Sequence, residues 1–358
     1  MIGVRLKLAR AAAGLSLRGL AAHISEYVSA QAIGKYERDE MMPSSTVLIA
    51  LARALKVTEE YLLNPAAVDL VAVEFRKKKL TSARETAEVR ARILSDVERY
   101  LDIEKILAIQ PAKASPFARR YPVHNVEDIE QAAEEFRKRW NLGNDPIPNL
   151  CEFLEEKGIK ICAIPLPESV SGVQAMVKAA DGADVPVIVV NAEHAGERQR
   201  FTLAHELGHL CLDVRKLDPE PTCQRFAGAF LVPREVLVRE VGPTRHAIST
   251  RELFQLKQLF GTSAQAIAYR CKDLEIINQR MLSGILRLFN AKEWRTREPL
   301  ELPRERPSRF ERLCIRALAE DVISEGKASE LLQKTVREVV DSLDLPPESA
   351  SDAHAAGL

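Results

Sequence analysis

The decapeptide Phe201-Thr-Leu-Ala-His-Glu-Leu-Gly-His-Leu210 decides how this 358-residue sequence is interpreted. His205 and His209 are four residues apart, so on a helix they lie about 40° apart around the axis and both imidazoles can reach one ion. Glu206 then flanks the ion without binding it, which is the position of a general base. The alternative is a core helix whose histidines are only hydrogen-bonded, and the rarity of H-E-x-x-H favours the metal site.

A hydrolytic zinc ion needs a third protein ligand and one open coordination position. Glu220 is a candidate, because it begins an amphipathic segment a short loop after the motif helix. Four other residues compete with it but are less suited by position or type. Asp213 lies one helical turn beyond His209, too far along the axis to share its ion, and Asp218 lies in a loop. Cys211 lies on the wrong face of the motif helix, and Cys223 is expected to fill the core.

Two quoted segments carry a family resemblance. Arg198-Gln-Arg-Phe-Thr-Leu-Ala-His-Glu-Leu-Gly-His-Leu, followed by Glu220-x-x-Cys-Gln-x-Phe-Ala-x-x-Phe-Leu-Val-Pro, resembles the ImmA/IrrE family of zinc-dependent metallopeptidases. The resemblance implies that His205, His209 and Glu220 bind Zn²⁺, with Mn²⁺ as the alternative ion, and that Glu206 activates water.

This sequence departs from the family pattern at two places. Gln224 stands where the family often has Asn, and Thr222 stands where it often has an acidic residue. These departures leave the implied ligand set intact and affect only the groups that orient it.

The implied chemistry is attack of metal-activated water on a peptide carbonyl, with Glu206 transferring the proton. The oxyanion that forms needs a hydrogen-bond donor besides the metal. His246, Tyr269 and Arg200 are candidates, and a salt bridge, a packed phenol or a solvated loop is the alternative for each.

The first 65 residues are expected to form five short helices. The segments Arg5-Leu-x-x-Ala-Arg, Gly14-Leu-Ser-Leu, Leu20-Ala21, Gln31-Ala-Ile-Gly-Lys-Tyr-Glu37 and Pro43-Ser resemble the Xre/Cro-type helix-turn-helix domain. In that fold the third helix enters the major groove of double-stranded DNA. The implied contacts are Ser29, Ala30, Gln31 and Gly34 toward base edges, with Gln31 able to pair with adenine, and Arg18 and Lys35 on phosphates.

Two observations weaken this assignment of DNA contacts. The turn at residues 25–28 is about two residues longer than usual, which affects the base-facing register. Residues 1–65 hold eight Lys or Arg against six Asp or Glu, a net charge of only +2. A protein-binding module of the same fold is therefore the alternative.

The composition supports a multidomain globular protein. Hydrophobic residues make up 46% and charged residues 28%, and 51 basic side chains balance 51 acidic ones, which argues against coating nucleic acid by bulk charge. No apolar run is long enough for a membrane span, and the start lacks a signal-peptide layout. Because the six cysteines are scattered, we expect a reduced, cytoplasmic location and no membrane partner.

The predicted fold class is mainly α with a small β-sheet. Strands are expected at residues 159–164 and 185–190. The C-terminal helices include a stretch beginning at Ala317 that resembles a second helix-turn-helix fragment. Homodimerisation or sensing is the expected role there, and a second DNA site is the alternative. The predicted domains are a helix-turn-helix domain at 1–66, a helical linker at 67–124, an α+β zincin-like metallopeptidase core at 125–250, a helical region at 251–345 and a disordered tail at 346–358.

Two functions are compatible with these features. The first is a DNA-binding transcriptional regulator with a metal-dependent endopeptidase domain that cleaves a repressor, an antitoxin-type protein or itself. The second is a transcription factor whose peptidase-like domain senses or binds without catalysis. The presence of Glu206 favours the enzyme, because only catalysis requires this residue. A purely structural zinc site fits poorly, since three ligands leave a position open.

Overall fold

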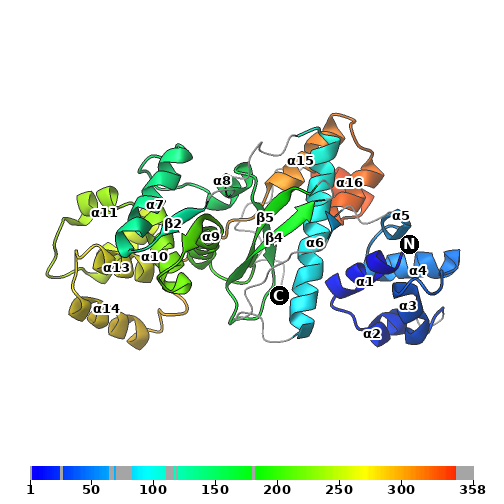
Figure 1. Ribbon diagram of the computed structural model, residues 1–358, viewed down its shortest axis with the longest axis horizontal. Helices are drawn as coiled ribbons and strands as arrows, with labels where there is room; N and C mark the ends of the chain where they lie inside the picture. The colour runs from blue at the N-terminus through cyan, green and yellow to red at the C-terminus, as the bar shows by residue number, and fades with distance from the viewer. Residues whose placement is uncertain are drawn as a thin grey trace. The chain divides into compact units, whose positions relative to one another are not determined.

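The computed structural model describes residues 2–24, 27–63, 68–69, 83–109, 117, 120–179 and 182–343. Within these ranges the chain is mainly helical with one four-stranded sheet and one pair of strands, which confirms the predicted fold class (Figure 1). The expected disordered tail at 346–358 lies outside the described residues, as do residues 25–26 of the helix-turn-helix turn. No helix in the described part is long and apolar enough to cross a membrane.

The chain divides into two compact units. One unit contains residues 1–113, 175–185 and 308–348, and the other contains residues 114–174, 186–307 and 349–358. The C-terminal helices beyond Ser308 therefore group with the N-terminal domain and not with residues 251–307. This grouping depends on contacts between residues more than 200 positions apart, such as the hydrogen bond from Arg99 Nη1 to the carbonyl of Leu331.

Five helices form the N-terminal domain, as predicted. They are α1 (Gly3–Ala12), α2 (Leu17–His23), α3 (Ala30–Glu37), α4 (Ser45–Leu55) and α5 (Glu59–Leu63). Serine side chains cap the starts of α2, α3 and α4 by accepting backbone N–H groups that a helix end leaves unpaired. Leu6, Leu20, Ile33 and Leu51 are fully buried in its core.

The long helix α6 (Ala83–Ile106) organises the rest of this unit. Its middle part binds α1, since Arg92 Nε donates to the carbonyl of Ala12 and Glu98 pairs with the buried Arg5. Toward its second half it packs against α15 (Arg309–Ala319) and α16 (Glu325–Leu332), which α17 (Val336–Leu343) follows. One helix thus contacts both the N-terminal domain and the C-terminal helices.

The main sheet has the strand order β1-β4-β5-β3. The two predicted strands appear as β3 (Lys160–Ile164) and β5 (Asp184–Asn191), which pair in parallel with Cys162 opposite Val189. β4 (Gly172–Ala179) was not predicted, and it pairs antiparallel with β1 (Val68–Asp69). A separate parallel pair joins β2 (Tyr121–Val123) to β6 (Leu212–Val214). β5 is buried along nearly its whole length, as expected for an apolar strand inside a sheet.

The helices of the second unit surround α9 and α10. They are α7 (Val126–Arg139), α8 (Leu150–Glu156), α9 (Gly196–Cys211), α10 (Pro219–Leu231), α11 (Arg234–Val241), α12 (Thr250–Phe260), α13 (Ala264–Asp273) and α14 (Gln279–Ala291). α10 packs against α7, α9 and α13. Gly208 allows α9 and α10 to approach closely, because a Cβ atom there would lie only 3.0 Å from Phe226 Cδ1 and 3.3 Å from Cys223 Cβ.

Candidate metal centre

The motif helix α9 directs both histidines to one point. His205 and His209 are buried, and their Nε2 atoms lie 3.0 Å apart with the ring planes at 90°. Both Nε2 atoms therefore face one shared position, from which the two imidazoles could bind a single metal ion.

The first turn of α10 brings a carboxylate to the same point. Asp218 caps this helix by accepting the N–H of Glu220 at 3.1 Å, and Pro219 occupies a position near the helix start that has no use for an N–H. The carboxylate oxygens of Glu220 lie 3.3 Å from His205 Nε2 and 3.4 Å from His209 Nε2. The structure thus brings together the three residues that the sequence names as ligands.

The donor set and its spacing fit zinc. Bonds of roughly 2.0–2.2 Å to nitrogen and oxygen in tetrahedral geometry place neighbouring ligand atoms about 3.3–3.5 Å apart. The separations found here are 3.0, 3.3 and 3.4 Å. The side chain of Glu220 is 46% exposed, so one side of the centre is open to solvent.

The competing ligands point elsewhere. Asp213 pairs with Arg215, with 2.7 Å between Nη2 and Oδ2, and Asp218 serves as the cap of α10. Cys211 directs its thiol to the carbonyl of Gly208, and burial raises the pKa of Cys211 well above its usual value, so it is not available as a thiolate.

Glu206 is almost completely buried on α9 next to the ligand pair. Its side chain lies beside the start of β4, where Gly172 leaves room for it. A Cβ atom on Gly172 would lie 3.7 Å from Glu206 Cγ and only 2.4 Å from Thr202 Cγ2. The glycine therefore lets β4 approach α9 closely at Thr202.

Cys223, which the sequence analysis considers as a ligand and assigns to the core, has a contact at the site that was not predicted. It is buried, as expected for a core residue, but its Sγ also lies 2.9 Å from His209 Nδ1. Because it follows Glu220 by three residues, α10 presents the carboxylate and the thiol on one face. The spacing E-x-x-C was the signal that could have indicated this contact.

The three candidate oxyanion donors have different surroundings. Arg200 is buried and structural, because its guanidinium donates to the carbonyls of Ile147 and Pro148 and pairs with Glu305. His246 is exposed in the segment after α11. Tyr269 of α13 lines a cleft of about 700 Å³ that also borders α9 and α10.

The residues assigned to DNA lie on and beside α3. Arg18, Ser29, Gln31 and Lys35 are exposed, and Ala30 is half-buried. Ser29 also caps α3 through the N–H of Ala32 at 3.3 Å. Gly34 is buried on α3, where an added Cβ would lie 3.3 Å from Arg38 Nη1 and 3.7 Å from Leu17 Cδ1 of α2, and this burial speaks against a place at base edges.

Fold and site define a DNA-binding domain joined to a metallopeptidase-type domain. Residues 154–272 match the IrrE N-terminal-like domain, and residues 6–62 match the helix-turn-helix family. No curated protein matches the chain. The chain thus fuses an Xre/Cro-type helix-turn-helix domain to an ImmA/IrrE-type peptidase domain, which confirms the resemblance found in the sequence.

Proposed function

We propose that this protein is a cytoplasmic transcriptional regulator whose ImmA/IrrE-like domain is a metal-dependent endopeptidase. Its substrate would be a repressor, an antitoxin-type protein or the chain itself. The observation that supports this proposal most directly is the convergence of three side chains, with one candidate ligand atom from each lying within 4.8 Å of the others, beside a buried carboxylate. A site that served only structure would gain nothing from Glu206.

His205, His209 and Glu220 would hold Zn²⁺, with Mn²⁺ as the alternative. When bound, the ion would supply Lewis acidity that polarises a peptide carbonyl and acidifies water. Glu206 would accept the proton of the attacking water and deliver it to the leaving amine. Burial of its carboxylate favours this exchange, because bulk water is kept from competing for the proton.

The helix-turn-helix domain would bind a double-stranded operator. Exposed Gln31 near the start of α3 is suited to an adenine edge, with Ser29 and Ala30 beside it. Arg18 and Lys35 would contact phosphates and contribute affinity that decreases with salt.

One experiment tests the catalytic proposal. Purified protein is analysed for bound metal and incubated with a repressor encoded beside its gene, with Glu206→Gln as the matched variant. We expect one ion per chain in both proteins, and we expect the variant to cleave at least about a hundredfold more slowly than the wild type. Metal without cleavage of any tested protein would instead favour the sensing or binding role.

A further inference from the structure

We infer that the cleft beside the metal centre is the subsite for a bulky, uncharged side chain that adjoins the scissile bond. This inference rests on the proposed peptidase function and names the class of peptide that the site selects. The cleft measures about 700 Å³, which lies within the range of roughly 300–1,000 Å³ typical of ligand pockets.

The cleft shares two walls with the metal centre. Phe201 lines it and precedes His205 by four residues on α9, while Gln224 lines it and follows Glu220 by four residues on α10. Residues four apart on a helix lie on the same face. When a substrate peptide bond lies at the three metal ligands, the substrate side chain next to that bond therefore reaches the cleft wall at Phe201 and Gln224.

The walls are largely apolar. They come from α7, α9, α10 and α13 and from the segments before α10 and after α14. Burying a leucine-sized side chain against such a surface contributes about 1.5–3 kcal/mol, equivalent to a tenfold or hundredfold gain in affinity. The apolar residues that define this subsite are Ile129, Phe201, Leu217, Pro221, Ala266 and Tyr269.

The charged groups in the walls are already engaged by partners within the protein. Glu197 and Glu298 both contact the fully buried Lys257, whose Nζ lies 2.6 Å and 3.2 Å from their carboxylates. Arg225 is likewise bound, at 3.1 Å from Glu130 and 3.5 Å from Asp273. A charged substrate side chain would lose its hydration here and find these partners engaged, so the cleft disfavours it.

Three further charged residues line the cleft at its solvent edge. Arg198, Asp218 and Arg295 are exposed and hydrated. Charges in such surroundings contribute little to binding, so they do not reverse the preference for an apolar side chain.

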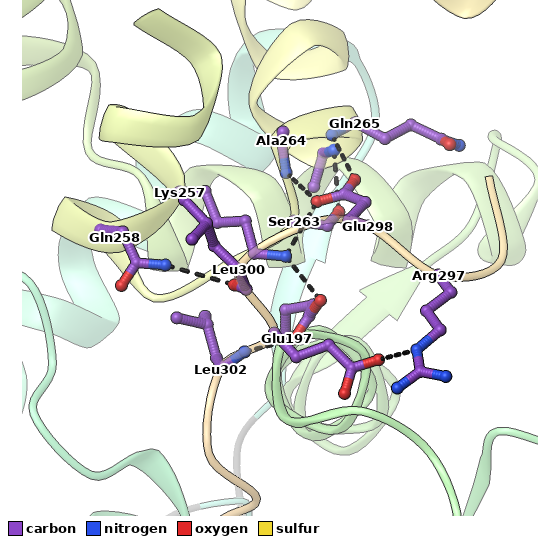
Figure 2. A network of polar contacts seen from close by, with 12 residues as sticks. Glu197, Lys257, Gln258, Ser263, Ala264, Gln265, Arg297, Glu298, Leu300 and Leu302 are labelled. Atoms are coloured by element: carbon purple, nitrogen blue, oxygen red, sulfur yellow. Dashed lines mark hydrogen bonds and ion pairs between the residues drawn. The ribbon is translucent and has the colours of Figure 1, made fainter. Parts of the chain in front are cut away.

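Residues 292–307 follow α14 and form an extended segment, here called the strap, that supplies part of the cleft wall. Figure 2 shows polar contacts of this strap. Glu298 accepts the N–H groups of Ala264 and Gln265 at 2.8 and 3.0 Å at the start of α13. Glu197 accepts the N–H of Leu302 at 3.0 Å. The same carboxylates bind Lys257, so the strap is fixed to α9, α12 and α13.

Two of the cleft's walls lie outside the IrrE-like match. That match covers residues 154–272, whereas Ile129 belongs to α7 and Glu298 to the strap. Segments flanking the domain thus shape the subsite, and its preference is a property of this chain.

The test uses zinc-loaded full-length protein and two series of hydroxamate ligands, one for each side of the scissile bond. N-acetylated amino-acid hydroxamates carry Gly, Leu or Asp side chains, and 2-substituted succinyl hydroxamates carry hydrogen, isobutyl or carboxymethyl groups. In the series whose side chain enters the cleft, we expect calorimetry to show that the ligand with the isobutyl side chain binds about ten- to a hundredfold more tightly than the ligand with hydrogen at that position. The acidic side chain should give no gain.

Ala266→Trp would fill the cleft from α13 and reduce this preference to about threefold or less, while the zinc content stays that of the wild type. Leu288→Trp places the same side chain on the exposed face of α14 outside the cleft and should retain the preference. Tyr269→Ala, at a 44% exposed position, removes wall surface without filling the cleft and should also lower the preference.

Absence of an apolar preference in both wild-type series, or a preference for the acidic ligand, would overturn the subsite alone. The same holds if N-acetyl-leucine amide binds metal-free protein as tightly as the hydroxamate binds the loaded protein, because the cleft would then be an effector pocket. Failure to take up zinc would overturn the peptidase proposal itself.

Discussion

Cys223 Sγ lies 2.9 Å from Nδ1 of His209, on the side of the imidazole opposite the nitrogen that faces Glu220. A histidine that binds metal through Nε2 keeps its proton on Nδ1, and this proton usually goes to a carboxylate, a carbonyl or water. Here a buried sulfur occupies that position. α10 therefore contacts His209 of α9 on both sides of the ring, through Glu220 at Nε2 and through Cys223 at Nδ1.

Replacing this thiol should weaken metal binding without changing the ligands. We expect Cys223→Ala to reduce zinc affinity about 10–100-fold, because the ring of His209 loses the partner that fixes its tautomer. Competition titration against a chelating dye measures this directly. Cys223→Ser should recover part of the affinity, whereas Cys271→Ala, at an equally buried cysteine on α13, should leave it unchanged. Equal affinity in Cys223→Ala and wild type would contradict the role.

The close approach of α9 and α10 depends on Gly208. We expect Gly208→Ala to destabilise the protein by about 1–3 kcal/mol and to weaken zinc binding, because its Cβ would overlap Phe226 and Cys223 and push Glu220 from the histidines. Thermal unfolding with and without zinc measures both effects. Gly228→Ala on α10, where the added Cβ meets only Arg270 Cδ at 3.7 Å, is the matched control and should be neutral or stabilising.

The ligand set was readable from the sequence because its geometry is local. His205 and His209 lie on one helix, and Glu220 follows after a short loop. Cys223 escaped prediction because its contact depends on how closely α10 packs against α9. The environment of Arg200 depends on Glu305, which is 105 residues away. No local pattern encodes such a partner.

The strands of the main sheet also differ in how far the local sequence predicts them. β3 and β5 consist largely of β-branched and other apolar residues, which predict strands. β4 contains Gln174, Ala175, Met176 and Lys178, all of which favour a helix as much as a strand. Its conformation is therefore set by pairing with neighbouring strands, which the sequence does not reveal.

The exposed side chains on α3 predict separable effects on DNA binding. Lys35→Ala should weaken binding to all sequences and lower the slope of log affinity against log salt by about one, because one phosphate contact is lost. Gln31→Ala should cost about 1–3 kcal/mol on the operator and relax its preference at one adenine. Mobility shifts at several salt concentrations separate the two. Lys7→Ala, at an exposed position on α1, is the control. If this variant lost as much DNA affinity as Lys35→Ala, the assignment of α3 as the DNA-contacting helix would be contradicted.

Glu130 of α7 should make the second unit sensitive to acid. Burial alone would raise the pKa of Glu130, but hydrogen bonding and charge from Arg270, with Arg225 beside it, lower this pKa below its usual value. A lowered pKa stabilises the fold above the pKa of the unfolded chain, near 4.3, and this contribution disappears as pH falls through the folded-state pKa.

We therefore expect Glu130→Gln to lower the free energy of unfolding by up to about 3 kcal/mol at pH 7, because Arg270 stays buried without its charged partner. The difference from wild type should shrink as the pH falls through the lowered folded-state pKa of Glu130, because the wild-type carboxylate then becomes protonated as well. Urea denaturation at pH 7, 5, 4 and 3 measures this. Glu135→Gln, on the same helix in an exposed pair with Arg139, should change stability little at any of these pH values. A constant difference between wild type and Glu130→Gln from pH 7 to 3 would show that the carboxylate acts through packing and not through its charge.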